Sequence, residues 1–473
     1  MFKKIEFGYA DASNEALYQP RLINEGYYDH KNALSHARFK PDFLFLGNKG
    51  AGKSILGEKL ENEAAHDPEF FVKRINLEDF PFKTFDKLSP SKESSEATYP
   101  SAWAWLLLIS VMDSIQQDES MAQGADFSET FGTLRSVGLL PDANIRRIIE
   151  HSSKRTFSLD ILKTLKITEE GNLPDAIGRM PMLEDHLLKA ILSVNFGSQH
   201  IVVIDGLDDI LTGKEMQYKA IGSLIFQARR LNMHFAKNRQ KIKIIILCRT
   251  DVFEKANNTN KNKIRQDTSV KLDWYRGEEN LAENELVKLA NARAHLYIDK
   301  NIDIFDSFFP KRINHTETIK HLLNHTRHTP RDFLQLMKSM QNFYNSRTLS
   351  ENDVKEGVKH YSSEYFLPEI KDSLVGIISD KIIEQVFSYF GKTRSRELKT
   401  RDFINFIEEE ISDDPDVLAS ILDALFSSCA IGNIQRVGRE TRYSYKFRNQ
   451  NSTFSINEDI MLHRGLWKAL NLS

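Results

Sequence analysis

Four short apolar runs, rich in β-branched and aromatic residues, occur within the first 255 residues, and more polar or helical stretches separate them. They span residues 43–46, 71–77, 201–204 and 242–247. Three of them are nearly continuous in apolar residues, which is typical of strands buried on both faces of a sheet. Strands of this kind that alternate with helices predict an α/β fold with a parallel sheet.

One part of this region is longer than a single helix and strand require. The most apolar stretch, residues 103–112 (WAWLLLISVM), is about half of the roughly 20 residues needed to span a bilayer, so we expect a buried helix and no membrane segment. Residues 116–178 are polar with scattered glycines and predict a helical insertion. A further helix is expected at residues 182–194.

The pattern becomes helical after residue 255. Residues 281–296 and 331–343 carry apolar positions at a spacing near 3.6, which predicts amphipathic helices. We expect them to form a helical lid over residues 256–345, with a link to the last region at about 346–353.

The last region, residues 375–473, shows three helical patterns followed by three strand patterns, an order that predicts a winged-helix domain. The helices are expected at residues 382–390, 400–411 and 416–426, and the strands at 431–437, 443–448 and 453–456. The fold expected from the whole chain is therefore an α/β domain (residues 1–255, with the insertion at 116–178), a helical lid and a winged helix.

Composition and charge narrow the function classes. The 473 residues carry a formal net charge of −2, which gives no sign of a dedicated nucleic-acid partner. Cys248 and Cys429 lie far apart and follow no metal-ligand spacing, so neither zinc nor a disulfide is expected. The N-terminus lacks the apolar core of a signal peptide, and we expect a cytoplasmic protein.

The octapeptide directly after the first predicted strand fits the phosphate-loop pattern GxxxxGK[ST]. This glycine-rich loop consists of Gly47, Asn48, Lys49, Gly50, Ala51, Gly52, Lys53 and Ser54. Glycines let backbone N–H groups approach phosphates, and the helix that follows adds the positive end of its dipole. Lys53 is expected to reach the β- and γ-phosphates of ATP or ADP, and Ser54 to bind Mg²⁺.

The third predicted strand ends in an acidic cluster. Asp205 stands at its carboxyl end, where an aspartate would hold Mg²⁺ through water. Asp208 and Asp209 follow in the turn, and we expect at least one of them to orient the attacking water of a hydrolysis reaction. Each of these two aspartates could instead cap the next helix.

Two arginines are candidates for sensing the γ-phosphate. Arg249 follows the fourth predicted strand, with Asp251 placed to orient it; the alternative is a salt bridge at the rim of the sheet. Arg331 follows Pro330 at the start of a lid helix and would couple the lid to the nucleotide; the alternative is a solvated helix start.

Together, residues 47–54, 201–209, 247–251 and 329–332 resemble the AAA+ and STAND classes of P-loop ATPases, and the DGLDD segment is most similar to the NACHT-type Walker B motif. In those classes the ATPase domain, lid and winged helix fold over ADP, and exchange for ATP promotes oligomerisation. The resemblance implies a homo-oligomer or a separate effector protein as partner. An arginine finger would come from Arg229, Arg230 or Arg265.

The segments FLGNKGAGKS, CRTDVFE, LDW and HRGLWKALNL also resemble a poorly characterised group of bacterial P-loop ATPases, several of which are encoded near anti-phage genes. Residues 460–466 resemble the MHD motif of plant-type STAND proteins, which implies that His463 touches the ADP β-phosphate. Arg464 stands where that motif has aspartate, and an amphipathic terminal helix is the alternative for this segment.

Origin-recognition ATPases, which combine a similar core with a DNA-binding winged helix, give the rival interpretation. The third helix of that module enters the major groove, but residues 413–430 contain four aspartates and no lysine or arginine. A basic hairpin remains, with Arg436, Arg439, Arg442, Lys446 and Arg448. The sequence thus favours an ATP-binding and ATP-hydrolysing switch over a DNA reader. A small-molecule phosphotransferase, the third class, lacks an acceptor motif.

Overall fold

The structure is a computed structural model. It describes residues 1–78, 80–85, 95–122, 124–141, 144–152, 176–207, 215–256, 261–275, 277, 281, 283–345, 347–438 and 440–472. The chain divides into two compact units. The sheet unit comprises Asp29–Gly47 and Lys53–Leu272, and the helical unit comprises Met1–Tyr28, Asn48–Gly52 and Asp273–Ser473.

The sheet unit is built on five parallel strands in the order β2-β3-β4-β1-β5. They are β1 (Leu44–Gly47), β2 (Phe70–Asn76), β3 (Gln199–Asp205), β4 (Ile242–Arg249) and β5 (Ser269–Lys271). The predicted α/β class and the four predicted strands are confirmed. Strand β5 was not predicted, because three residues with one buried side chain give no periodic signal.

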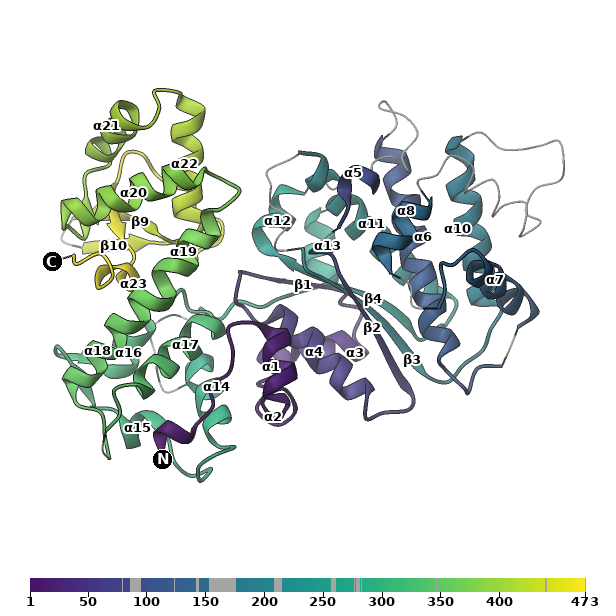
Figure 1. The fold of residues 1–473 in the computed structure, drawn as a ribbon, viewed down its shortest axis with the longest axis horizontal. Coiled ribbons are helices and arrows are strands. Elements are labelled where there is room, and N and C mark those ends of the chain that lie inside the picture. The colour runs from purple at the N-terminus through teal and green to yellow at the C-terminus, as the bar shows by residue number, and fades with distance from the viewer. Residues whose placement is uncertain are drawn as a thin grey trace. The chain divides into compact units, whose positions relative to one another are not determined.

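Helices cover both faces of this sheet (Figure 1). Helices α3 (Ala33–Phe39) and α4 (Lys53–Ala64) lie on one face, and α6 (Ser95–Gln116), α10 (Ala176–Leu192) and α11 (Glu215–Lys237) lie on the other. The predicted buried helix at 103–112 is confirmed within α6. The indole N–H of Trp103, at 1% exposure, donates to the carbonyl of Ala220 at 2.9 Å. Covering both faces explains why β1, β3 and β4 are nearly continuous in apolar residues.

The described part of the predicted insertion is helical, with α7 (Ala125–Ser136) and α8 (Ile145–Ser152). Helix α7 packs against α10, and α8 against the short α5 (Phe82–Phe85). Residues 153–175 lie outside the described residues. Two further helices, α12 (Thr250–Lys255) and α13 (Lys261–Thr268), connect β4 to β5. None of the helices in the described part of the chain combines the length and apolar character that crossing a bilayer requires.

The helical unit contains the two predicted lid helices, as α14 (Glu285–Ala294) and α17 (Pro330–Gln341). Its other lid elements are α15 (Ile304–Phe308), β6 (Arg312–Ile313), β7 (Thr316–Glu317), α16 (Thr318–Leu323), α18 (Glu351–Tyr361), the π-helix η4 (Ser362–Phe366) and α19 (Leu367–Leu374). The expected link at 346–353 ends earlier than predicted. Ser350 and Asp353 form a capping box that starts α18 there, and α18 packs on α17.

The N-terminal segment folds into the helical unit through η1 (Phe2–Lys4), α1 (Ala12–Tyr18) and α2 (Pro20–Asn24). The Phe2 ring is fully buried and contacts the rings of Phe308 and Tyr344. Arg293 on α14 binds both carboxylate oxygens of Glu15, at 2.9 and 2.6 Å. This buried ion pair and the aromatic contacts fix the segment to the lid helices.

The C-terminal part contains the three predicted helices, α20 (Asp380–Thr393), α21 (Thr400–Glu410) and α22 (Pro415–Ser427). An antiparallel sheet in the order β10-β9-β11-β8 accompanies them. Its strands are β8 (Glu397–Leu398), β9 (Ile431–Val437), β10 (Glu440–Ser444) and β11 (Asp459–Leu462), and a short helix α23 (Arg464–Trp467) follows.

Two strand predictions here were wrong in position. The second strand was expected at 443–448 but is β10, which ends at Ser444, and the third was expected at 453–456 but is β11. Tyr445 and Phe447 suggest strand alternation, yet both rings pack into one hydrophobic cluster from a turn. The terminal amphipathic helix that was the alternative at 460–466 is also wrong in its first part, because Asp459–Leu462 pairs with both β9 and β8.

Candidate functional site

The carboxyl ends of β1, β4 and β3 lie at one edge of the parallel sheet. Strand β4 lies between β1 and β3, and Gly47 at the end of β1 is in register with Arg249 at the end of β4. The connection after β1 runs toward β2 at one edge of the sheet, whereas the connection after β4 runs toward β5 at the opposite edge. Open parallel sheets bind ligands outside the carboxyl ends of strands where the connections diverge in this way.

At this edge, the first residues of α4 meet the end of β3. Lys53 is 3% exposed, and its ammonium group donates to the carbonyl oxygen of Gly47 at 3.3 Å. The Ser54 hydroxyl donates to the Asp205 carboxylate at 3.3 Å, and the Gly206 N–H donates to the same oxygen at 2.8 Å. The structure thus brings together four residues from the two sequence motifs, although a strand separates β1 from β3.

The turn after Asp205 requires a glycine. Gly206 has φ +78°, and a Cβ atom built on it would lie 1.9 Å from the side-chain oxygen of Asn76 and 2.9 Å from two backbone nitrogens of the neighbouring segment. The chain can therefore leave β3 at this point only without a side chain. Asp208 and Asp209, the predicted catalytic carboxylates, lie outside the described residues.

The side chains of Ser54 and Asp205 are suited to a hard divalent cation. A hydroxyl and a carboxylate 3.3 Å apart supply two oxygen ligands, and Mg²⁺ typically takes one or two protein ligands and completes its shell with phosphates and water. Among the described residues, no group of three or more histidine, cysteine or acidic side chains forms a metal cluster of its own. The donor set fits Mg²⁺ held jointly with a phosphate.

Arg249 is held by a bidentate ion pair with Asp251. Its Nε donates to Oδ1 of Asp251 at 2.9 Å, and its Nη2 donates to Oδ2 at 2.7 Å. Burial alone would raise the pKa of Asp251, but the Arg249 guanidinium outweighs burial and lowers it. The carboxylate is therefore ionised and fixes the guanidinium at the end of β4.

The middle of the glycine-rich loop, Asn48–Gly52, packs within the helical unit. The Trp274 indole donates to the carbonyl of Ala51 at 2.9 Å, and the backbone N–H of Arg331 donates to the carbonyl of Gly50 at 3.3 Å. Gly50 has φ +80°, and a Cβ atom there would lie 3.0 Å from Cβ of Arg331. This close approach holds the loop against the first turn of α17.

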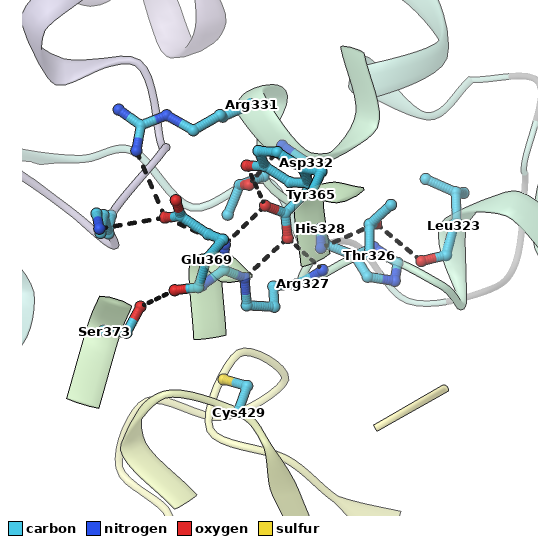
Figure 2. Close-up of polar contacts among 12 residues, drawn as sticks. Leu323, Thr326, Arg327, His328, Arg331, Asp332, Tyr365, Glu369, Ser373 and Cys429 are labelled. Carbon is cyan, nitrogen blue, oxygen red and sulfur yellow. Dashed lines mark hydrogen bonds and ion pairs between the residues drawn. The ribbon is translucent and has the colours of Figure 1, made fainter. Parts of the chain in front are cut away.

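A buried ion pair organises that first turn (Figure 2). Asp332 is fully buried, and its carboxylate accepts four hydrogen bonds. Three come from Arg327, from Nε at 2.8 Å, Nη2 at 2.7 Å and the backbone N–H at 3.0 Å. The fourth comes from the Tyr365 hydroxyl at 3.0 Å. Burial by itself would raise the pKa of the Asp332 carboxyl, but the Arg327 guanidinium outweighs burial and lowers this pKa. The Asp332 carboxylate in turn raises the pKa of Arg327 well above its usual value. Four donors thus satisfy one buried carboxylate.

Glu369 on α19 lies among three cationic side chains. Its Oε1 is 3.3 Å from Nζ of Lys49, 3.6 Å from Nη2 of Arg327 and 3.6 Å from Nη1 of Arg331. Figure 2 shows the carboxylate of Glu369 directed toward Arg331, with Arg327 on its other side. The same oxygen is buried and accepts no hydrogen bond of regular geometry within the described residues. The contacts are therefore mainly electrostatic.

His463 is buried, at 2% exposure, and stacks on the Phe366 ring at 4.8 Å. Its Nδ1 accepts a hydrogen bond from the N–H of Gly465 at 3.0 Å, so it caps α23. Burial lowers its pKa well below the usual value, which keeps the ring neutral. Among the described residues, no contact joins His463 to the glycine-rich loop. The His463 ring is buried by packing against Phe366, Tyr445 and Phe447.

Three residues with clear structural roles at this site had not been predicted: Trp274, Arg327 and Glu369. Trp274 belongs to the LDW segment, whose resemblance to other ATPases was its only sequence signal. Arg327 precedes the predicted helix start by four residues, and Glu369 gave no signal, because an acidic residue on a half-exposed helix is ordinary.

Comparison with known proteins gives one family match. Residues 280–367 match the family described as the FunZ-associated C-terminal helical domain. The match includes Arg327, Arg331, Asp332 and Tyr365, and it ends two residues before Glu369. No curated protein matches the chain. These 88 residues are thus similar to a helical domain already described, and the sheet unit lies outside the match.

Proposed function

We propose that this protein is an ATP-binding and ATP-hydrolysing switch, in which the helical unit responds to the phosphates of a nucleotide held by the glycine-rich loop. The observation that carries the proposal is the Glu369 carboxylate, which contacts a loop lysine and two lid arginines. Carboxylate and phosphate oxygens bind the same cationic partners. Glu369 therefore contacts the cationic side chains that a phosphate would compete for.

The switch follows from this competition. A bound γ-phosphate would attract Lys49 and Arg331 and would repel the carboxylate of Glu369, which would then leave. Because η4 joins α18 to α19 without a break, movement of Glu369 would be transmitted to the surrounding helices. A ligand shifts an equilibrium between two conformations by the difference in its affinity for them. Here the two conformations are those with and without the Glu369 contacts, and the loss of these contacts supplies the difference in affinity.

Residues of the sheet unit support the nucleotide chemistry. Lys53 would bind the β- and γ-phosphates, and Ser54 and Asp205, whose side chains lie 3.3 Å apart, would hold Mg²⁺, which would neutralise charge on the phosphates when bound. Arg249, fixed by Asp251, would stabilise charge that develops during hydrolysis. Asp208 or Asp209 would orient the attacking water.

The wider architecture agrees with the resemblance to AAA+ and STAND ATPases. The order α20, β8, α21, α22, β9, β10 and β11 supports the proposal of a winged helix. The resemblance to bacterial P-loop ATPases encoded near anti-phage genes, beside the match to the FunZ-associated C-terminal helical domain, is the basis for proposing a role in bacterial defence, with a homo-oligomer or a separate effector as the partner. The protein would act in the cytoplasm.

Direct DNA binding by the hairpin is less well supported. Arg436 contacts Asp459 at 2.7 Å and Glu397 at 2.9 Å, and Arg442 contacts Glu440 at 2.8 Å. These acidic partners compensate much of the positive charge that the sequence places on the hairpin. Phosphate contacts by the hairpin would have to replace existing ion pairs.

The decisive experiment compares two lysines on α4. Lys53→Ala should weaken binding of a fluorescent ATP analogue by at least about tenfold and abolish Mg²⁺-dependent phosphate release. Lys59→Ala, which removes an ion pair with Glu63 at 3.7 Å, should leave both unchanged. Normal binding and turnover in the Lys53 variant would exclude an ATPase at this loop.

A second experiment separates binding from hydrolysis. Asp208→Ala and Asp209→Ala should each bind the ATP analogue with wild-type affinity, and at least one should lower phosphate release by about a hundredfold or more, as expected for loss of a general base. Full turnover in both variants and in the double variant would remove these aspartates from the mechanism.

A further inference from the structure

The helical unit contains a cavity of about 750 Å³ that none of the residues of the glycine-rich loop lines. Its walls come from α16, the segment before β8, strand β10, the turn after it and α23. A cavity of this size lies within the range of roughly 300–1,000 Å³ that is typical of small-molecule sites. Its lining combines positive charge with aromatic rings, and each of these two properties limits the chemical class of ligand that the cavity can bind.

The charge of the cavity is strongly positive. Five cationic side chains line it (Lys320, Arg396, Arg442, Arg448 and Arg464) and one carboxylate, that of Glu397. Of these, Arg442 is paired with Glu440 at 2.8 Å. The Glu397 carboxylate already forms an ion pair with Arg436, at 2.9 Å. Among the described residues, Arg396, Arg448 and Arg464 form no ion pair with a carboxylate. The cavity therefore presents guanidinium groups that no acidic side chain compensates.

Arg448 gives a second, independent indication that the cavity binds an anionic ligand. Its Nε is buried and has no hydrogen-bond acceptor within the described residues. A buried donor without an acceptor costs roughly 1–3 kcal/mol, more when the donor is charged, so native proteins rarely leave one unmatched. The missing acceptor is expected to be an anionic oxygen of a ligand.

The aromatic rings specify the other part of the ligand. Tyr275, Tyr443, Tyr445, Phe447 and Trp467 line the same cavity. The Arg448 guanidinium lies 5.8–5.9 Å from the ring centres of Tyr275, Tyr445 and Phe447, and that of Arg396 lies 4.2 Å from the ring centre of Trp467. Alternating rings and guanidinium groups are the lining that stacks planar bases and neutralises phosphates.

We propose that this cavity binds a nucleotide unit, with its base stacked among the aromatic side chains and its phosphate held by Arg396, Arg448 and Arg464. The unit can come from a free nucleotide or from a single-stranded nucleic acid, since both present the same base and phosphate. The site is separate from the glycine-rich loop, and the inference does not depend on ATP binding there. It gives the helical unit a ligand of its own.

The test uses the intact chain and two probes that lack a triphosphate. One probe is a fluorescein-labelled oligothymidylate of ten nucleotides, and the other is thymidine 3′,5′-bisphosphate. Binding is measured by fluorescence anisotropy and by calorimetry at low and moderate salt. We expect the wild-type protein to bind at least one probe, with affinity that falls as salt increases.

Three variants and one matched control localise the binding. Arg396→Gln and Arg464→Gln should each weaken binding by about tenfold, as expected for loss of one charge-assisted contact. Tyr443→Leu should weaken it by a similar factor through loss of stacking. Arg401→Gln removes the same charge from an exposed position on α21, outside the cavity lining, and should leave the affinity within about twofold. Unchanged thermal unfolding midpoints verify that the variants are folded.

The outcomes are distinct. Binding of the bisphosphate identifies a free nucleotide as a sufficient ligand, and binding of the oligonucleotide alone identifies nucleic acid; both support the site. Failure of the wild type to bind either probe at about 1 mM would overturn it. An equal loss in the Arg401 control would also overturn it, because the binding would then reflect the general charge of the helical unit.

Discussion

The ammonium nitrogen of Lys49 lies 3.3 Å from Oε1 of Glu369, so a side chain of the glycine-rich loop is paired with a carboxylate of α19. Arg327 and Arg331 approach the same oxygen. The two arginines are themselves fixed, Arg327 by the buried Asp332 and Arg331 by its backbone bond to Gly50. The position of Glu369 is therefore determined by both the loop and the first turn of α17.

Removing the charge of Glu369 should favour nucleotide binding. In Glu369→Gln, a phosphate would no longer compete with a carboxylate for Lys49 and Arg331, and we expect an ATP analogue to bind on the order of tenfold more tightly. Glu364→Gln, an exposed position on the neighbouring π-helix, serves as the control and should not change the affinity. Equal or weaker binding in the Glu369 variant would contradict the competition.

Two glycines of the loop should differ in their response to alanine. Gly50 and Gly52 have φ +80° and +94°, so alanine strains the backbone at both, by roughly 1–3 kcal/mol. A Cβ atom at Gly50 would also meet Arg331 and Thr329, at 3.0 and 3.2 Å, whereas no atom lies within 4 Å at Gly52. Gly50→Ala should therefore lower the free energy of unfolding by about 1–2 kcal/mol more than Gly52→Ala. Chemical denaturation measures both, and equal losses would mean that contact with α17 is unimportant.

The buried pair of Arg327 and Asp332 should be sensitive to removal of one partner. Asp332→Asn leaves a guanidinium buried without its counter-charge, and we expect a loss of about 3–5 kcal/mol in the free energy of unfolding. Tyr365→Phe removes one hydrogen bond from the same carboxylate and should cost about 1 kcal/mol. Thermal and urea unfolding would measure the stability of the two variants. The prediction fails if the two variants are equally stable.

His200 on β3 should make stability depend on pH. It is fully buried, and burial lowers its pKa from 6.5 to about 4, despite Asp118 3.5 Å away. The unfolded chain therefore binds more protons than the folded chain between these values, and stability decreases as the pH falls from about 6.5 to about 4. At pH 5 this histidine alone should account for a loss of about 2 kcal/mol.

A pair of histidine variants isolates this effect. In His200→Gln, the loss of stability between pH 7 and pH 5 should be smaller than in the wild type by about 2 kcal/mol. His66→Gln, at an exposed position after α4, should retain the wild-type dependence. The same pH dependence in all three proteins would show that His200 does not titrate as expected.

Local patterns were sufficient for much of the fold. The strands at 43–46, 71–77, 201–204 and 242–247 were predictable, because burial on both faces requires continuous apolar residues. The three C-terminal helices were also predictable, since each carries apolar residues at helical spacing. Strand β5 and the positions of β10 and β11 were not, because their pairing depends on partners distant in sequence.

The sequence by itself determined the chemical groups of the candidate site and their order along the chain. The glycine-rich loop, Asp205 and Arg249 stand at the ends of predicted strands, and parallel pairing brings such ends to one edge. Only the tertiary structure decided that Glu369 faces Lys49, Arg327 and Arg331, and that arginines and aromatic rings surround one cavity. The physical reason is that electrostatic and stacking contacts act between side chains close in space, and nothing in local periodicity records which distant residues folding brings together.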